Sequence, residues 1–72
     1  MNNALRDFRK ELEKTQEEMS EILGVSLSMY RKVETGIRNP SFNFISKFKR
    51  TFPKSDIGKI FFENNVTKKN II

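Results

Sequence analysis

Four side chains within residues 27–32 combine hydrogen-bond donors, positive charge and an apolar group in a short stretch. Ser28 and Lys32 stand four positions apart, so they share one face if the segment is helical, and both can donate hydrogen bonds. Arg31 adds a second cation, and Leu27 adds an apolar contact. A cationic donor can pair with guanine O6 or N7 in the major groove, whereas a leucine can contact a thymine methyl group.

Two short helices joined by a glycine are predicted to hold this face. The first opens with the capping box Thr15-x-x-Glu18, in which each side chain satisfies a backbone N–H near the other residue. It begins at Gln16 and ends at Gly24, because glycine readily adopts the left-handed backbone of such a turn. Ser20 leaves room for a crossing helix. The apolar stripe, at three- and four-residue spacing, comprises Met19, Ile22 and Leu23.

The second helix of the pair begins after Ser26, whose side chain can cap it. Val25 fills the junction, and the inward positions of this helix are Tyr30 and Val33. The outward positions are then Leu27, Ser28, Arg31 and Lys32. A helix-turn-helix unit of this kind places the outward face of its second helix in the major groove.

Two further helices are predicted on either side of this pair. One runs from Ala4 to Glu13 and continues into Gln16 through a nearly continuous kink. Its inward residues are Leu5, Phe8 and Leu12. The other runs from Phe42 to Phe52, is capped by Ser41 and stops at Pro53. Its core stripe comprises Phe42, Ile45, Phe48 and Phe52, with Phe44 off the stripe.

A fifth helix is predicted to start at Ser55-Asp56, with Ile57, Ile60 and Phe61 as its inward positions. The polar residues that follow it, 64–72, are expected to form a mobile tail. The chain is therefore divided into a single domain over residues 1–63 and a tail over residues 64–72.

Residues 5–52 resemble the DNA-binding domains of the lambda repressor and Cro family. The resemblance is carried by Thr15-Gln16-Glu17-Glu18-Met19 and by the run Glu34-Thr35-Gly36-Ile37-Arg38-Asn39-Pro40-Ser41, in which capping, glycine and apolar residues follow the family pattern. It implies an all-α fold, a compact five-helix bundle with a helix-turn-helix formed by the second and third helices. It also implies a sequence-specific regulator of transcription that binds double-stranded DNA.

The resemblance assigns roles to individual positions. Leu27, Ser28 and Lys32 match positions that read base edges, with Arg31 beside them and Met29 as a second apolar contact to thymine. Gln16, Arg38 and Asn39 match positions that contact the DNA backbone, and backbone contacts orient a protein without reading sequence. Arg9 and Glu34 match a partly buried ion pair that orients the third helix. Solvated surface side chains are the alternative interpretation for the charged and polar members of this set.

Composition restricts the classes of function. The 72 residues include no cysteine and no histidine, which removes disulfides, thiolate nucleophiles, most zinc sites and the usual proton shuttle. The dense carboxylate cluster, Glu17, Glu18 and Glu21, has no apolar wall that would raise a pKa, so an enzyme is not expected. No metal, cofactor or small-molecule substrate is expected either. A cytoplasmic location is expected, since neither a signal segment nor a membrane helix is evident.

Charge is distributed unevenly along the chain. The net charge is +5, and from Arg31 onward only Glu34, Asp56 and Glu63 oppose ten Lys and Arg residues. A surface of this kind favours a polyanion such as DNA.

A domain this small is expected to act as a homodimer on a two-fold symmetric operator, as a repressor. Phe61 and Phe62 are successive, so both cannot face one core, and the predicted dimer interface comprises Phe44, Phe61 and Phe62. The alternative is an antitoxin-type interaction protein that neutralises a partner protein. Its docking surface would be an exposed apolar patch too large for a homodimer interface, and the candidate is the run from Ile57 to Phe62 together with Phe44.

Overall fold

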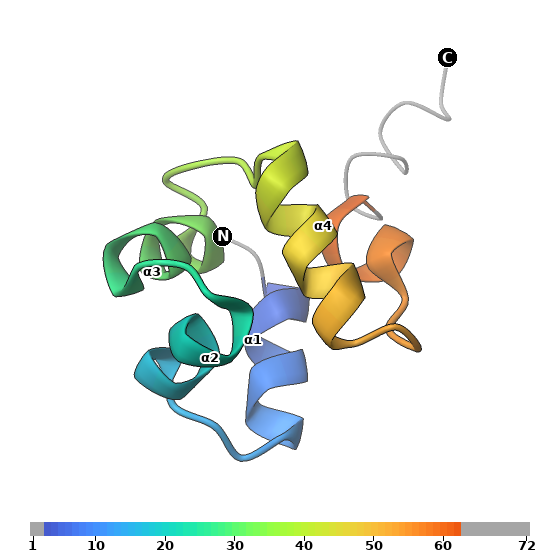
Figure 1. The fold of residues 1–72 in the computed structure, drawn as a ribbon, viewed down its shortest axis with the longest axis horizontal. Helices are drawn as coiled ribbons and strands as arrows, with labels where there is room; N and C mark the ends of the chain where they lie inside the picture. Colours follow the sequence, from blue (N-terminus) through green and yellow to red (C-terminus); the bar gives the residue numbers. More distant parts are fainter. Residues whose placement is uncertain (1–2, 63–72) are drawn as a thin grey trace.

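The computed structural model describes residues 3–62, and this part of the chain is entirely helical apart from its turns. Four α-helices are followed by one π-helical segment: α1 (Asn3–Glu11), α2 (Gln16–Leu23), α3 (Leu27–Thr35), α4 (Phe42–Thr51) and η1 (Gly58–Phe62). Figure 1 shows α2 and α3 on one side of α1, with α4 and η1 on the other. The all-α, five-helix architecture is thereby confirmed. The predicted tail over residues 64–72 lies outside the described residues.

The helix starts follow the predicted capping residues. Thr15 Oγ1 accepts a hydrogen bond from the backbone N–H of Glu18, and Glu18 Oε1 accepts one from the N–H of Thr15, which completes the capping box. Ser26 and Ser41 cap α3 and α4 in the same way, each accepting from the backbone N–H three residues later.

The end of α1 differs from the prediction. The helix stops at Glu11, and the chain turns sharply at Glu13, which has a φ of 57°. This left-handed conformation is unfavourable for a residue with a Cβ atom, and it replaces the predicted continuous kink. Leu12 lies beyond the end of the helix, and its side chain is 38% exposed, so its predicted inward position is wrong.

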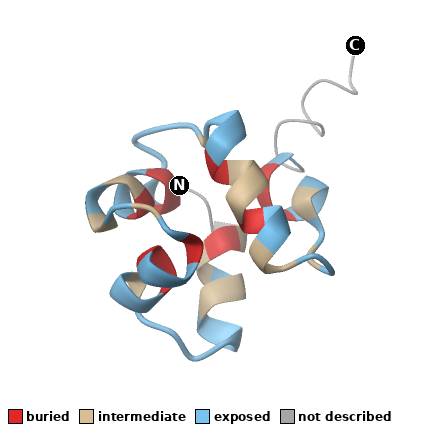
Figure 2. Cartoon of the chain, viewed as in Figure 1, coloured by how far each residue is buried: buried red, intermediate tan, exposed pale blue. Residues whose placement is uncertain are grey.

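One core connects the helices of the described part of the chain (Figure 2), and four of its nine buried apolar side chains are aromatic. Phe48 lies at its centre, with ring centroids 5.2 Å from Phe8 and 5.1 Å from Phe61, the latter pair edge to face. Tyr30 of α3 stacks on Phe44 of α4. The buried apolar side chains are Leu5, Met19, Leu23, Tyr30, Val33, Phe44, Phe48, Ile60 and Phe61.

The core stripe of α4 is rotated relative to the prediction. Phe44, predicted to lie off the stripe, is 2% exposed, whereas Phe42, predicted to lie on it, is 86% exposed. Phe44 and Phe48 are four positions apart and face the core together, which turns Phe42 toward the opposite side of the helix. On α2, Ile22 is also more exposed than predicted, because Met19, Ser20 and Leu23 form the buried face.

The fifth helical element is shorter than predicted. It is a π-helical segment that starts at Gly58, after Asp56, whose Oδ1 accepts a hydrogen bond from the N–H of Lys59. The neighbouring residues Ile60 and Phe61 are both buried there, as predicted for these two positions. The segment packs against α1 and closes the core on that side.

Candidate nucleic-acid interface

One face of α3 carries an unbroken row of polar side chains. Ser28, Arg31, Lys32 and Thr35 are all exposed and follow the i, i+3, i+4, i+7 spacing of a single helical face. The opposite face is occupied by Tyr30 and Val33, which are 0% and 1% exposed. The structure thus brings three predicted site residues, Ser28, Arg31 and Lys32, onto one surface.

The two side chains predicted to make apolar contacts with thymine are less exposed than the polar ones. Leu27 is half-buried at the first position of α3. Met29 is half-buried as well and packs against the core, where it lines a hollow of about 260 Å³ between the α2–α3 turn and α4. Packing therefore takes up part of the Met29 side chain, and the outward face of α3 is mainly polar.

Contacts from both neighbouring helices fix the start of α3. Gly24 has a φ of 75°, and the backbone N–H of Val25 donates to the carbonyl of Ser20 at 3.0 Å. Lys47 of α4 donates its Nζ to the Gly24 carbonyl at 3.1 Å. This contact at the carboxyl end of α2 places a cation where the helix dipole favours one. Sequence reasoning missed Lys47, which carries no local signal because its partner is 23 residues away.

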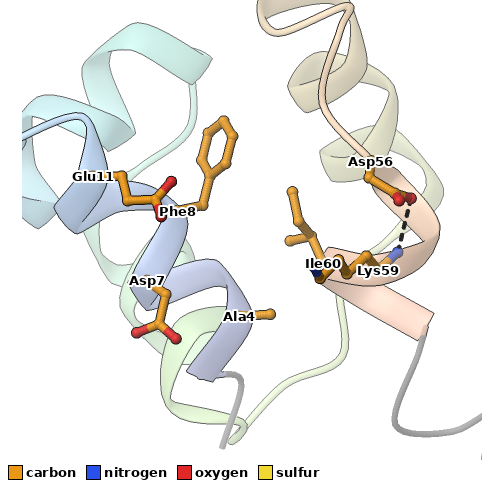
Figure 3. A pocket seen from close by; sticks show the side chains of 7 residues that line it. All are labelled: Ala4, Asp7, Phe8, Glu11, Asp56, Lys59 and Ile60. Carbon is orange, nitrogen blue, oxygen red and sulfur yellow. Dashed lines mark hydrogen bonds between the residues drawn. The ribbon is translucent and has the colours of Figure 1, made fainter.

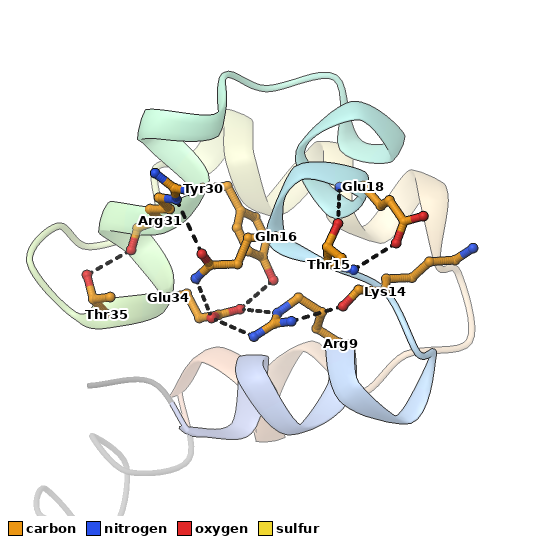
Figure 4. A network of polar contacts seen from close by, with 9 residues as sticks. All are labelled: Arg9, Lys14, Thr15, Gln16, Glu18, Tyr30, Arg31, Glu34 and Thr35. Atoms are coloured by element: carbon orange, nitrogen blue, oxygen red, sulfur yellow. Dashed lines mark hydrogen bonds and ion pairs between the residues drawn. The ribbon is translucent and has the colours of Figure 1, made fainter.

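A network of polar side chains ties α3 to α1 (Figure 4). Arg9 Nε lies 2.9 Å from Glu34 Oε2, and Arg9 Nη2 lies 3.2 Å from Glu34 Oε1. Arg9 also donates through Nη1 to the Lys14 carbonyl, which anchors the turn after α1. Both side chains are largely buried, with 14% and 5% of their surface exposed. A bidentate geometry of this kind holds the angle between two helices.

Glu34 is saturated with donors. Besides the two bonds from Arg9, it accepts from the Tyr30 hydroxyl at 2.7 Å and from Gln16 Nε2 at 2.8 Å. Each carboxylate oxygen thus receives two hydrogen bonds. Tyr30 was predicted only as a core residue, although a tyrosine at a buried position commonly signals a polar partner for its hydroxyl.

The network also sets the ionisation of its members. Burial opposes the charge on Glu34, but the hydrogen bonds from Arg9, Tyr30 and Gln16 outweigh it, so the pKa of Glu34 lies below its usual value. Burial, together with the bond to Glu34, raises the pKa of Tyr30. The bond to Glu34 raises the pKa of Arg9. The network is therefore a stable arrangement of charged Arg9, charged Glu34 and neutral Tyr30.

Gln16 links this network to the outward face of α3. While its Nε2 donates to Glu34, its Oε1 accepts a hydrogen bond from Arg31 Nε at 3.3 Å. Gln16 is the first residue of α2, and Arg31 lies in the middle of α3, so the pair bridges the two helices of the motif (Figure 4).

The loop after α3 is exposed. Its first turn is closed by Gly36, with a φ of 86°, and by a hydrogen bond from the backbone N–H of Arg38 to the carbonyl of Lys32 at 3.0 Å. Arg38 and Asn39 are both exposed there. Ile37 is 78% exposed in the same loop, an apolar position to which the sequence analysis assigned no role.

Two of the three predicted interface aromatics are core residues. Phe44 and Phe61 are 2% and 8% exposed, and their rings pack edge to face, 6.1 Å apart. Neither ring is available to a second molecule, because α4 and η1 turn both toward Phe48. Phe62 is 42% exposed and remains available.

A separate hollow of about 340 Å³ lies between α1 and η1 (Figure 3). Asp7, Glu11 and Asp56 line it together with Lys59, and Phe8 and Ile60 form its apolar part.

Among residues 3–62, no cluster of carboxylate, histidine or cysteine side chains is arranged to hold a metal ion. Within the same range, no helix has the length and apolar character needed to cross a membrane.

In a comparison with protein-family models, a helix-turn-helix family model matches residues 5–56, which is well over half of the chain. The match begins two residues inside α1 and includes the whole of α2, α3 and α4. Neither the curated proteins nor the solved structures give a match.

Proposed function

This chain belongs to the lambda repressor and Cro-like helix-turn-helix family, and we propose that it regulates transcription by binding one specific sequence of double-stranded DNA through α3. The family consists of DNA-binding domains that regulate transcription. The finer points, namely the bases read, the dimer and the direction of regulation, are part of the proposal.

The observation that carries the proposal is the outward face of α3. A nine-residue helix exposes Ser28, Arg31 and Lys32 on one side while Tyr30 and Val33 fix its other side in the core. The helix of a helix-turn-helix that enters the major groove reads bases with side chains near its N-terminus. We assign base reading to Ser28 and Lys32, with apolar contacts to thymine from Leu27 and the accessible part of Met29.

Backbone contacts would flank this face. Arg38 and Asn39 lie in the exposed loop that follows α3, and Gln16, at the start of α2, lies beside Arg31 and Glu34. We assign contacts with the sugar-phosphate backbone to the two loop residues, since such contacts orient a protein on the duplex. The net charge of +5 supports binding to a polyanion.

We further propose a homodimer that represses by occupying a two-fold symmetric operator. A single nine-residue recognition helix reads few base pairs, and two copies one helical turn apart double that number. The half-exposed Phe62, at the end of η1, is the one predicted interface aromatic that remains exposed, and we assign the contact to it.

The alternative function is an antitoxin-type protein that neutralises a partner. The exposed apolar residues that could bind such a partner differ from those predicted from the sequence. With Phe44, Ile60 and Phe61 buried, the predicted apolar docking surface is reduced to Phe62 and the half-buried Ile57. Ile37 and Phe42 are the apolar side chains that the structure exposes most. They support a partner-binding role, and such a role is compatible with DNA binding by the same chain.

Selection from a random duplex library tests the proposal. Purified protein is expected to enrich a single motif with two-fold symmetry, and an excess of unrelated duplex should not displace it. Recovery of no motif, with the same weak affinity for all duplexes, would contradict sequence-specific regulation. The antitoxin alternative alone would be favoured if the chain bound no duplex and instead co-purified with one defined protein.

A further inference from the structure

We propose that Arg31 contacts a DNA phosphate and does not read a base, and that Gln16 is a positioning residue that holds Arg31 at the DNA backbone. The inference rests on the proposed function and concerns the same interface. It revises the two roles expected from the sequence, in which Arg31 lies among the base readers and Gln16 contacts the phosphate directly.

The side-chain amide of Gln16 has a defined direction, with its donor end toward Glu34. Its Nε2 donates to Glu34 Oε1 at 2.8 Å, and the two oxygens of Glu34 accept from Arg9, Tyr30 and Gln16 together. A carboxylate accepts hydrogen bonds only, so it orients the donor end of the Gln16 amide toward itself. The carbonyl oxygen Oε1 must then face the other way, and that is where Arg31 Nε lies at 3.3 Å.

On a duplex, α2 and α3 would lie at different places, and this separates the expected surroundings of Arg31 and Lys32. In a helix-turn-helix complex, the second helix lies in the major groove and the first helix crosses the backbone. Gln16 is the first residue of α2, and Figure 4 shows its contact with Arg31. An Arg31 side chain held by Gln16 would therefore lie toward the strand that α2 crosses. Lys32 has no such tie among the interactions found for residues 3–62, and it keeps the freedom to reach a base edge.

The Arg31 guanidinium and the Gln16 amide also differ in their ability to bind a phosphate. A guanidinium has five N–H donors, and the bond to Gln16 uses only the Nε donor, so both terminal nitrogens remain for a bidentate contact with phosphate. In Gln16, Oε1 accepts a hydrogen bond from Arg31 and Nε2 donates one to Glu34. A neutral amide that already makes two hydrogen bonds is a weaker phosphate ligand than a cation with free N–H donors. The chain from Arg9 through Glu34 and Gln16 to Arg31 thus connects the buried ion pair to the DNA backbone.

A binding cycle with Gln16→Met and Arg31→Met tests the inference, since methionine is an unbranched side chain that matches glutamine in length, replaces most of the aliphatic part of arginine, and removes the hydrogen bonds of both. Affinity is measured against the selected operator and against a scrambled duplex over a range of salt. Arg31→Met should weaken both duplexes by the same factor and lower the salt slope by about 0.9, the value for one phosphate contact. Gln16→Met should give a smaller uniform loss. The double variant should bind like Arg31→Met alone, because Gln16 acts only through Arg31.

Three controls keep the outcomes distinct. Arg31→Lys keeps the charge but loses the Nε donor to Gln16, so it should keep the salt slope and lose part of the affinity. Thermal unfolding of every variant shows whether a loss of binding reflects a loss of fold. Base preferences across the operator library should be unchanged in Arg31→Met.

Several results would overturn the inference while leaving the proposed function intact. These are a changed base preference in Arg31→Met, an unchanged salt slope, or losses that multiply in the double variant. If the wild-type protein binds duplexes without sequence preference, sequence-specific regulation fails, and the salt slope still decides the role of Arg31. If it binds no duplex, both proposals fail.

Discussion

Arg9 and Glu34 lie 25 positions apart in the chain, yet two hydrogen bonds of 2.9 and 3.2 Å join them across the interface of α1 and α3. The pair fixes the angle between α1 and α3 from the buried side of α3 and uses no side chain of its outward face. Its partly buried position makes it important for stability, since a buried charge that loses its partner is costly.

Breaking this ion pair should strongly destabilise the fold. Removal of one partner leaves a charge with 14% or 5% exposure unpaired, and such losses cost about 3 to 5 kcal/mol, against about 1 kcal/mol at most for an exposed pair. Chemical denaturation of Arg9→Ala, Glu34→Ala and the double variant measures the coupling. The double variant should be less destabilised than the sum of the single variants. Strict additivity would contradict a coupled pair.

Stability should fall in acid because of Glu34. Its pKa is lowered in the folded protein, so the unfolded chain takes up its proton first as the pH falls. The stabilisation is present above the usual carboxyl pKa near 4.5 and is lost as the pH drops through the lower, folded-state value. Unfolding followed from pH 6 to 2 should show this loss in the wild type. The comparison variant Glu34→Gln should have lower stability at neutral pH and a shallower acid dependence, and an identical dependence in both proteins would refute the assignment.

Replacement of Glu13 by glycine should stabilise the protein. Glu13 has a φ of 57°, a left-handed conformation that costs a residue with a Cβ about 1 kcal/mol or more and that glycine adopts freely. We expect Glu13→Gly to raise the free energy of unfolding by about 0.5 to 1 kcal/mol. Glu13→Ala is the control, because it removes the same charge and keeps the Cβ. Equal effects of the two substitutions would attribute any gain to charge and not to backbone conformation.

Phe62 should govern the oligomeric state. It is 42% exposed on η1, whereas Phe42 is 86% exposed at the start of α4, so Phe42→Lys offers a matched control on a different element. A charge buried in an apolar contact is unfavourable, so Phe62→Lys should shift sedimentation toward the monomer at micromolar concentration. Phe42→Lys should leave the dimer unchanged. A wild-type protein that sediments as a monomer would refute the dimer, and dissociation by Phe42→Lys alone would move the interface to α4.

The local parts of the fold were predictable from the sequence. The capping residues Thr15, Ser26 and Ser41 act within three positions of themselves, and Gly24 adopts the left-handed turn expected of it. Such contacts depend on neighbours in the chain and leave a readable pattern. The Arg9–Glu34 pair, although distant in sequence, could be anticipated because the family resemblance supplied the two positions.

Features that depend on tertiary packing were harder to predict. The chain has seven phenylalanines, so the sequence of α4 is compatible with more than one apolar stripe. The stripe that buries Phe44 is selected by the packing of α1 and η1 around Phe48. The bond from Gln16 to Arg31 was missed for a similar reason. The roles of Gln16 and Arg31 were predicted from the position of each residue alone. The orientation of the Gln16 amide instead follows from the hydrogen bonds that the Glu34 carboxylate accepts.

If the outward face of α3 reads base pairs, as proposed, the side chain of Lys32 should contribute to the base preference. Operator-library preferences should be measured at one salt concentration for the wild type, Lys32→Ala and Lys54→Ala, a control that removes another exposed lysine, from the turn after α4. Lys32→Ala should lose about 1 to 3 kcal/mol on the preferred sequence and relax the preference at one base pair, while Lys54→Ala should keep the full preference. If Lys32→Ala keeps every base preference and only weakens binding to all sequences alike, Lys32 contacts the backbone and the assignment of base reading to this face is contradicted.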